Sequence, residues 1–329
     1  MRTIVWWAWF ACTTCSELRV MKVGVIGAGN WGKNLVKNFL ELGVLSGVAD
    51  PVEANRQAAR DMAPSAEIFS SGRDLIAGDC NAIAIATPVP THFELVAAGL
   101  RAGKDVFVEK PMTLTSGEAE ELVNLAETHE RILMVGHLLL FQPPIQFIKR
   151  FLGEGKLGKL YHLHQERKKL GRARYIENVT WSLGVHDIAV LLYLVGSQPR
   201  RVFASGHCGL QEKVEDDVYV HMEFLDGMKA HLHNSWLWPT NRRQLTIIGE
   251  KGMLVYDEIA ATVTWHRKRI NDELESIDEG SEVVFEGSGP PLRIELEHFI
   301  DCIKTRKAPI SDGRNGLAVV TVLERIMMF

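Results

Sequence analysis

Residues 22–32 read Lys-Val-Gly-Val-Ile-Gly-Ala-Gly-Asn-Trp-Gly, and this stretch decides the fold expected for the chain. Val23, Val25 and Ile26 form an apolar, β-branched run that is typical of a strand buried on both faces. Three glycines follow in the spacing G-x-G-x-x-G, and apolar residues then recur at helical spacing over 35–42. The order strand, glycine turn, helix is the context in which this spacing binds a dinucleotide.

Each glycine of the turn has its own expected role. Gly27 permits the tight turn, Gly29 lets backbone N–H groups approach the pyrophosphate, and Gly32 lets the helix pack against the strand. A second apolar run, 44–49, ends in Asp50, whose carboxylate is placed to accept hydrogen bonds from both ribose hydroxyls. Because a 2′-phosphate would meet this negative charge, the pattern favours NAD over NADP. The alternative interpretation is a glycine-rich turn in another kind of α/β protein.

Length and composition restrict the class of protein. A chain of 329 residues exceeds what one hydrophobic core usually organises, so we expect two domains. The net charge of −4 argues against a protein that coats nucleic acid, and we expect no nucleic-acid partner. The 5 cysteines are few, odd in number and scattered, which suits free thiols in a reducing, cytoplasmic environment.

The two ends of the chain carry separate expectations. Residues 4–12 are apolar and rich in tryptophan behind a single Arg2, which faintly resembles a short signal peptide. The stretch is too short to span a bilayer as a helix, and we expect no membrane segment. The first strand begins directly after Met21, so we expect Met21 to be the true start and 1–20 to be a non-structural extension. The Cys12-x-x-Cys15 pair lacks partners and indicates no metal site. The final helix, 317–329, lacks a C-cap signal, which indicates that the natural chain runs further.

An alternation of strands and helices continues up to residue 140. The further strands of this region are expected at 44–49, 66–69, 82–86, 105–108 and 132–135. The helices between them are expected at 52–62, 74–77, 91–102 and 115–129. Six strands separated by helices predict a doubly wound parallel sheet that binds ligands at its C-terminal edge. We therefore expect residues 21–140 to form an NAD-binding Rossmann domain.

The pattern changes after residue 141. A long strand is expected at 160–169 and a strongly apolar helix at 184–195. Further strands with short turns are expected at 201–207, 217–225, 228–237, 243–249 and 253–256. Residues 141–329 therefore predict an α+β domain with a large, mostly antiparallel open sheet. We expect 268–290, which is polar and acidic, to be a surface loop, and 292–304 to be a helix.

Three side chains are candidates for the chemistry. Lys110 follows a buried strand and precedes Pro111; beside a positively charged nicotinamide its pKa would fall, which suits proton exchange or polarisation of a hydroxyl. His186 begins an apolar helix and is placed to act as a general base near neutral pH. His137 ends the sixth strand, where it would face the cofactor. The alternatives are an ordinary surface lysine and two histidines that merely pack or cap.

A basic segment, 166–174, precedes the apolar helix. In an acidic protein this concentration of positive charge predicts an anionic substrate such as a nucleotide diphosphate, because arginine binds phosphate in bidentate fashion. The candidate substrate-binding residues are Arg167, Arg172, Arg174, Asn178, Trp181 and His186. The alternatives are a solvated strand face and, against the net charge, DNA binding.

Signatures of competing chemistries are missing from the sequence. It contains no G-x-S-x-G elbow, no G-x-x-x-x-G-K-[ST] loop and no H-E-x-x-H helix motif. The histidines are frequent but lack metal-ligand spacing with cysteines, so we expect no metal.

Four motifs, in order and at matching spacing, resemble those of the Gfo/Idh/MocA oxidoreductases. They are 27–32, Ala86-Thr87-Pro88 with His92, Glu109-Lys110-Pro111 and Gly184-Val185-His186-Asp187. The resemblance covers 21–329 and implies a Rossmann domain, a second domain whose open sheet forms homodimers or homotetramers, and hydride transfer at a sugar or cyclitol carbon. It implies that Lys110 and His186 are catalytic. The nicotinamide-site segments of the family fall on Thr87, Pro88, His92 and Glu109. Together with the residues singled out above, the predicted cofactor-binding set is Gly27, Gly29, Asn30, Trp31, Gly32, Asp50, Thr87, Pro88, His92, Glu109, Lys110 and His137.

One position departs from the family pattern. Many members carry aspartate four residues before the histidine, as D-x-G-x-H, whereas this chain has Ser182, which leaves Lys110 and His186 as the working pair. The segment 171–187 resembles the branch that oxidises the 3-hydroxyl of UDP-amino sugars. That implies NAD-dependent conversion of UDP-N-acetylglucosamine to its 3-keto sugar, a substrate for transamination to a 3-amino sugar of cell-envelope glycans. The alternatives are the C6-uronate of that sugar, a free sugar or cyclitol, and a non-enzymatic NAD sensor.

Overall fold

A computed structural model describes residues 21–175 and 177–327, and these divide into two compact units. Unit 1 comprises the described residues up to Val108 together with Leu125–Ile132, and unit 2 comprises Glu109–Asn124 together with the described residues from Leu133 onward. The expectations about residues 1–20, including the Cys12-x-x-Cys15 pair, and about the last two residues of the final helix lie outside the described residues. The domain boundary at residue 140 stays a prediction.

A six-stranded sheet confirms the expected doubly wound architecture. Its strands are β1 (Val23–Ile26), β2 (Leu45–Ala49), β3 (Glu67–Phe69), β4 (Ala82–Ile85), β5 (Asp105–Glu109) and β6 (Leu133–Gly136). They lie in the order β3-β2-β1-β4-β5-β6, and the pairs from β3 to β5 are all parallel. β1 and β4 are buried along their whole length, as the continuous apolar runs predicted. The order reverses between β1 and β4, where doubly wound sheets bind their ligands.

The helices of this region agree with the predicted ranges to within a few residues. They are α1 (Gly32–Glu41), α2 (Glu53–Met62), α3 (Gly72–Ala77), the 3₁₀ turn η2 (Val89–Thr91), α4 (His92–Arg101) and α5 (Ser116–Thr128). α1 buries Leu35, Val36 and Phe39, which share one helical face. This packing holds the N-terminus of α1 at the glycine turn.

Unit 2 contains an eight-stranded, mostly antiparallel sheet, which confirms the second part of the predicted fold. Its strands are β7 (Leu160–Leu170), β8 (Arg201–His207), β9 (Asp217–Glu223), β10 (Lys229–Ser235), β11 (Leu237–Gly249), β12 (Gly252–Asp257), β13 (Thr262–Ile270) and β14 (Ser276–Glu286). They lie in the order β14-β13-β12-β11-β7-β10-β9-β8, and only β7 and β10 pair in parallel.

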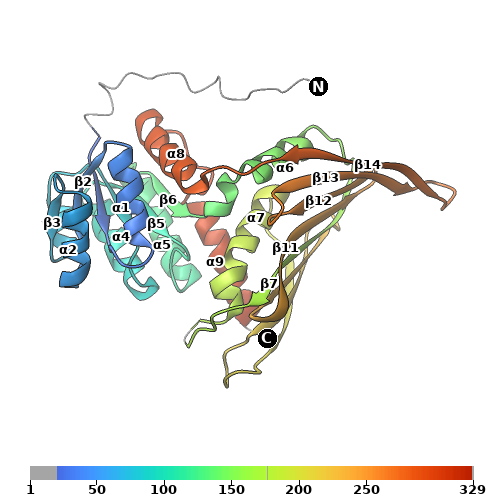
Figure 1. Ribbon diagram of the computed structural model, residues 1–329, viewed down its shortest axis with the longest axis horizontal. Coiled ribbons are helices and arrows are strands. Elements are labelled where there is room, and N and C mark those ends of the chain that lie inside the picture. The colour runs from blue at the N-terminus through green and yellow to red at the C-terminus, as the bar shows by residue number, and fades with distance from the viewer. Residues whose placement is uncertain (1–20, 176, 328–329) are drawn as a thin grey trace. The chain divides into compact units, whose positions relative to one another are not determined.

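Helices cover one face of this sheet, as Figure 1 shows for α7 and α9. The helical elements of unit 2 after β6 are η3 (Leu138–Phe141), α6 (Pro143–Gly153), the π-helical turn η4 (Thr180–Gly184), α7 (Val185–Val195), α8 (Pro291–Thr305) and α9 (Gly313–Met327). α7 is buried on nearly every side and contacts both α9 and β7. A helix buried all round explains why this stretch of sequence is apolar without a polar face.

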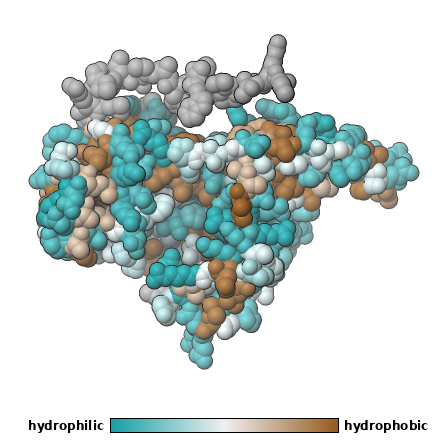
Figure 2. Space-filling view, in the orientation of Figure 1, coloured by the Kyte–Doolittle hydropathy of each residue, from teal (hydrophilic) through white to brown (hydrophobic). Residues whose placement is uncertain are grey.

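The segment 268–290 corrects the sequence analysis, because most of it is not a loop. β13 and β14 form a long hairpin that reaches beyond the other strands of the sheet (Figure 1). Charged side chains pair across it, with Lys268 Nζ 2.9 Å from Asp278 Oδ2 and Arg269 Nη1 2.8 Å from Glu279 Oε1. The visible surface of the hairpin is accordingly mostly hydrophilic (Figure 2). Strands held by cross-strand charge pairs lack the apolar alternation that predicts a half-buried strand.

Candidate active site

Packing around the turn after β1 requires glycine at two of its three glycine positions and leaves space for a side chain at the third. Gly27 has a φ of 92°, and a Cβ there would lie 2.7 Å from the carbonyl oxygen of Ala86. A Cβ on Gly32 would lie 1.9 Å from the carbonyl oxygen of Gly27. At Gly29, in contrast, a Cβ would meet no atom within 4 Å. The protein therefore tolerates a side chain at residue 29, and a glycine there leaves space for a ligand.

The N-terminus of α1 favours an anion in that space. The helix has no side-chain cap and no acidic residue in its first turn. Its first N–H groups therefore keep their partial positive charge for a bound group. The turn thus fits the pyrophosphate of a dinucleotide.

We expect Gly29→Ala to fold normally but to bind NAD about 10-fold or more weakly, because hydrogen bonds to a charged group are each worth about 1.5–3 kcal/mol. Gly117→Ala is the matched control, since a Cβ at Gly117 also meets no atom within 4 Å. Calorimetric titration with NAD and a thermal melt test this. Equal NAD affinity in both variants would contradict the assigned role of Gly29.

Asp50 ties the end of β2 to the glycine turn. Its Oδ2 accepts a hydrogen bond from the backbone N–H of Ala28 at 2.7 Å, and its Oδ1 accepts one from that of Val52 at 2.8 Å. The side chain is buried. Because each carboxylate oxygen has two lone pairs, Asp50 can also accept bonds from ribose hydroxyls. The negative charge lies at the turn, where the prediction of NAD over NADP requires it.

The other predicted cofactor residues of unit 1 follow β4 or lie in the glycine turn. The buried ring of His92 has its Nε2 2.9 Å from the carbonyl oxygen of Thr87, and Pro88 leads into η2. This hydrogen bond fixes the turn at the end of the strand. Asn30 and Trp31 have exposed side chains at the start of α1. Contact of these residues with the cofactor stays a prediction.

In unit 2, Lys110 lies against the π-helical turn η4. Its Nζ donates a hydrogen bond to the backbone carbonyl of Ser182 at 3.3 Å. Burial lowers the pKa of Lys110, while the neighbouring carboxylates of Glu109 and Glu177 oppose that shift. Residue 182, at which the resembled family often has aspartate, therefore still contacts Lys110, but through the main-chain carbonyl of Ser182. π-helical turns are frequent at functional sites.

His186 and His137 share the surroundings of Lys110. Burial lowers the pKa of His186 well below its usual value, and the charges of Lys110 and Arg167 lower it further. Burial and Lys110 lower the pKa of His137 to about 3. His186 Nδ1 and both ring nitrogens of His137 are buried and make no hydrogen bond within the described part of the chain. The structure thus brings together three of the predicted residues, with both imidazoles neutral at physiological pH.

The guanidinium of Arg167, a predicted substrate-binding residue, pairs with two carboxylates of the protein. Its Nε lies 2.8 Å from Asp187 Oδ1, and its Nη2 lies 2.6 Å from Glu258 Oε2. Glu258 Oε1 also accepts a hydrogen bond from Arg243 at 2.9 Å, and Asp187 Oδ2 accepts one from Asn234 at 3.0 Å. Arg167 is buried. The guanidinium thus holds this network under the start of α7, and contact of Arg167 with substrate stays a prediction.

Asn178 is likewise used inside the protein. Its Oδ1 accepts hydrogen bonds from the backbone N–H groups of Thr180 and Trp181 at 3.1 and 3.0 Å, so it binds the first two N–H groups of the turn η4. Its amide donates to Glu215 at 2.9 Å. Asn178 is buried and shapes the turn that carries Ser182, and its contact with substrate stays a prediction.

The remaining predicted substrate residues stay accessible. Arg172 and Arg174 are exposed, and Arg174 lies 3.4 Å from Glu177. Trp181 is half-buried in η4. An exposed basic loop beside the turn is compatible with binding of an anionic group, and these three assignments stay predictions.

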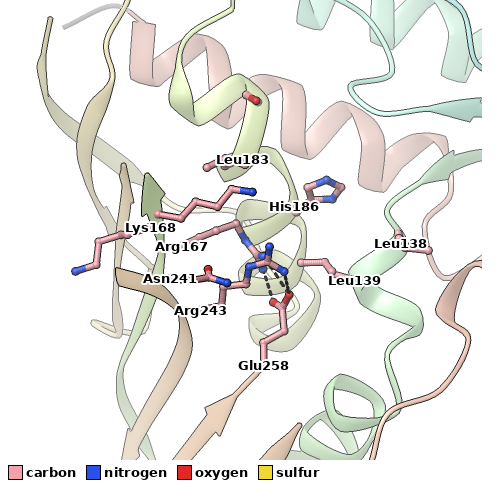
Figure 3. A pocket seen from close by; sticks show the side chains of 11 residues that line it. Leu138, Leu139, Arg167, Lys168, Leu183, His186, Asn241, Arg243 and Glu258 are labelled. Carbon is pink, nitrogen blue, oxygen red and sulfur yellow. Dashed lines mark hydrogen bonds and ion pairs between the residues drawn. The ribbon is translucent and has the colours of Figure 1, made fainter. Parts of the chain in front are cut away.

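A cavity of about 210 Å³ opens beside these groups in unit 2. In Figure 3, His186 projects from α7, Leu138 and Leu139 lie across from it on η3, and the ion pairs of Glu258 close one side. The residues that line the cavity are Leu138, Leu139, Arg167, Lys168, Lys169, Ser182, Leu183, His186, Asn241, Arg243 and Glu258. An apolar wall opposite a neutral imidazole and polar groups is suited to a sugar ring.

Several residues of the cavity and of the ion-pair network around Arg167 were missed by the sequence analysis. Arg243 and Glu258 belong to late strands and turns with no motif of their own, and Asn234 lies within an ordinary strand pattern. Asp187 was quoted only as part of a motif. Its adjacency to His186 was the one signal in the sequence for a buried carboxylate here.

The described residues, 21–175 and 177–327, contain neither a metal-ligand cluster nor a membrane-spanning helix. No group of three or more His, Cys, Asp or Glu side chains among them is arranged to hold a metal ion. No helix among them is long and apolar enough to cross a membrane.

Comparison with known proteins places this geometry in a family. Residues 21–137 match the family model described as "Oxidoreductase family, NAD-binding Rossmann fold", and residues 145–255 match the "GFO/IDH/MocA C-terminal domain". The chain belongs to the Gfo/Idh/MocA family. Its first domain is therefore an NAD-binding Rossmann domain, as the glycine turn and Asp50 predicted.

Three relatives cover nearly the whole chain. UDP-N-acetylglucosamine 3-dehydrogenase from Acidithiobacillus ferrooxidans is 26% identical over 91% of this chain and 94% of its own length. Its solved structure matches with a TM-score of 0.82 over 94% of this chain and 97% of that chain. Myo-inositol 2-dehydrogenase from Thermotoga maritima is 24% identical over 90% of this chain and 92% of its own length.

The third, the WlbA dehydrogenase from Bordetella pertussis, was solved in complex with NADH and UDP-GlcNAcA. It matches at 21% identity with a TM-score of 0.78 over 94% of this chain and 95% of that chain, which is a likeness of fold. The A. ferrooxidans and T. maritima relatives are thus dehydrogenases of a nucleotide sugar and of a cyclitol. Membership therefore shows that the chain belongs to an oxidoreductase family. It does not identify the substrate, which has to be inferred from the site.

Proposed function

We propose that this protein oxidises the C3 hydroxyl of UDP-N-acetylglucosamine to the 3-keto sugar, with NAD as acceptor. The observation that carries the proposal is the neutral His186 at a sugar-sized cavity, joined to Lys110 through the turn that contains Ser182. The A. ferrooxidans relative with that activity, which aligns with most of the chain, supports the choice of substrate. We further propose a cytoplasmic homodimer or homotetramer.

The proposed reaction divides the work between two side chains. His186 accepts the proton of the C3 hydroxyl, because burial and neighbouring cations keep its imidazole neutral and its buried Nδ1 has no competing partner in the described chain. Lys110 hydrogen-bonds the same oxygen and stabilises the negative charge that develops there. NAD, when bound, supplies the acceptor for the hydride from C3. The exposed arginines Arg172 and Arg174 would receive the diphosphate.

Asp187 does not replace the carboxylate that many family members place at residue 182. Both of its oxygens are bonded, one to Arg167 and the other to Asn234. Within the described residues no hydrogen bond joins Asp187 to His186, so in the proposed reaction the carboxylate supports the start of α7 and does not receive the proton of His186.

Other functions make different predictions. The C6-uronate of the same sugar would use the same residues, and so would a free sugar or cyclitol that lacks the nucleotide. A non-enzymatic NAD sensor would bind NAD and reduce none of it. Absorbance at the NADH band, after mixing protein and NAD with each sugar, separates these functions. An increase with UDP-N-acetylglucosamine supports the proposal, and an increase only with myo-inositol or a free sugar contradicts it.

The depressed pKa of His186 has a testable consequence for the pH profile. A general base is active when unprotonated, so lowering its pKa extends activity toward acid. We expect the acidic limb of kcat/KM to lie clearly below pH 6.5, the ordinary pKa of histidine. Steady-state rates between pH 4.5 and 9 measure this. A limb at or above the ordinary value would contradict a buried His186 as the base.

A further inference from the structure

The cavity beside His186 contains one cation that the protein leaves without a counter-charge. Lys169 is half-buried and lines the cavity. Within residues 21–175 and 177–327, its ammonium group makes no hydrogen bond and no ion pair. A charged group in a partly enclosed site is stabilised when an opposite charge binds beside it.

The two guanidinium groups at the cavity are compensated. Arg167 lies 2.8 Å from Asp187 and 2.6 Å from Glu258, and Arg243 lies 2.9 Å from Glu258. Two cations thus face two carboxylates in one network. Neither guanidinium adds net positive charge to the cavity.

Lys168 also lines the cavity, but its ammonium group is compensated on the other face of the sheet. Its Nζ lies 2.7 Å from Glu166 and 3.8 Å from the centre of the Trp238 ring. Successive side chains of a strand point to opposite faces, so Lys169 shares the face of Arg167 and not that of Lys168. Lys169 therefore lies on the side of β7 that carries the ion network and α7.

A local irregularity of the sheet keeps Lys169 from a strand partner. The ladder between β7 and β11 shifts register between Leu237 and Arg242, so Leu170 and Lys168 pair with β11 while Lys169 does not. Asn241, inside the shifted segment, lines the same cavity. Such bulges are over-represented next to active sites, where they re-aim side chains.

The size of the cavity limits what Lys169 can meet. Cavities that enclose a complete drug-sized ligand measure about 300–1,000 Å³. At about 210 Å³ this one suits a sugar ring, with the remainder of a nucleotide sugar outside. The anionic groups attached to such a ring are the diphosphate at C1 and, in a uronate, the carboxylate at C6.

We propose that Lys169 binds the anionic group carried by the sugar and thereby selects an anionic sugar derivative over a neutral free sugar. The inference rests on the proposed function, whose site it refines. An ammonium group is a compact point charge that pairs with either phosphate or carboxylate. The ion pair is the same in both cases, and the two sources are distinguishable by substrate.

The test compares Lys169→Gln with wild type and with Lys169→Arg, which keeps the charge. Lys159→Gln is the matched control, because Lys159 precedes the same strand, is exposed, and does not line the cavity. We expect KM for UDP-N-acetylglucosamine to rise about 10-fold or more in Lys169→Gln, with kcat little changed, since the charge pair exists in both ground and transition states. Lys169→Arg is expected to restore most of the affinity.

Binding of UDP alone, measured by calorimetry, gives a readout that does not need turnover. Weaker UDP binding and higher KM for both the neutral sugar nucleotide and its uronate identify the diphosphate as the partner. A higher KM for the uronate alone identifies the carboxylate. Unchanged UDP binding and unchanged KM for both substrates overturn the proposal. If wild type reduces no NAD but Lys169→Gln weakens UDP binding, the proposed function fails while the role of Lys169 stands.

Discussion

Lys110→Met is expected to lower kcat by about 10²–10⁴-fold, the range typical of a removed acid–base or charge-stabilising group. Methionine keeps the length and apolar stem of the side chain and removes the ammonium that donates to the carbonyl of Ser182. The reaction then loses its hydrogen-bond donor to the substrate oxygen. We expect affinity for NAD to change far less than kcat, because the glycine turn and Asp50 belong to unit 1.

Lys149→Met is the matched control for this prediction. The ammonium of Lys149 donates to the backbone carbonyls of Tyr193 and Leu194 at 2.7 and 3.2 Å, and burial lowers its pKa as it does for Lys110. Lys149 does not line the cavity. We therefore expect this variant to melt at lower temperature and to keep its kcat. Near-normal turnover in Lys110→Met would overturn the assignment.

A third variant separates the two roles open to Lys110. Lys110→Arg keeps a permanent positive charge but cannot accept a proton at ordinary pH. Partial activity in this variant supports Lys110 as the stabilising cation and His186 as the base. Activity as low as in Lys110→Met, together with substantial activity in His186→Gln, assigns the base to Lys110.

The elements predicted well from the sequence are those whose signal is local. The buried strands β1 and β4 and the helix α1 carry their periodicity within a few residues, so the Rossmann sheet was predicted in full. The β13–β14 hairpin was missed because its strands are held by cross-strand ion pairs and not by an apolar face. Composition alone therefore predicts a loop where these charged strands form.

The site was predictable in part for a related reason. Lys110 and His186 stand in short motifs, so each was found without knowledge of the fold. The partner of a charged residue, however, is chosen by tertiary structure: Arg167 meets Glu258 across a separation of 91 residues. A run of basic residues therefore looks alike whether its members face substrate, as we propose for Lys169, or are neutralised inside the protein, as Arg167 is.

Arg167→Met is expected to lower the free energy of unfolding by about 3–5 kcal/mol, the cost of breaking a buried ion pair on one side. Asp187 is fully buried and would keep only the amide of Asn234, while Glu258 would keep Arg243. Urea denaturation measures the loss. Arg243→Met is the control, because Arg243 is one-third exposed and, among residues 21–175 and 177–327, forms an ion pair with Glu258 alone, so we expect a loss of about 1 kcal/mol or less.

The pH dependence of that loss identifies its cause. Burial raises the pKa of Asp187, and Arg167 opposes this rise, so removing Arg167 raises the folded-state pKa further above 3.8, the unperturbed value. The folded variant then binds more protons than its unfolded chain, and its stability increases as pH falls from neutral toward that value. We therefore expect the deficit against wild type to be smaller at pH 5.5 than at pH 8. Adding Asp187→Asn, which removes the orphaned charge, should recover part of it at pH 8. A pH-independent deficit without such recovery would mean that Arg167 stabilises the fold by packing alone.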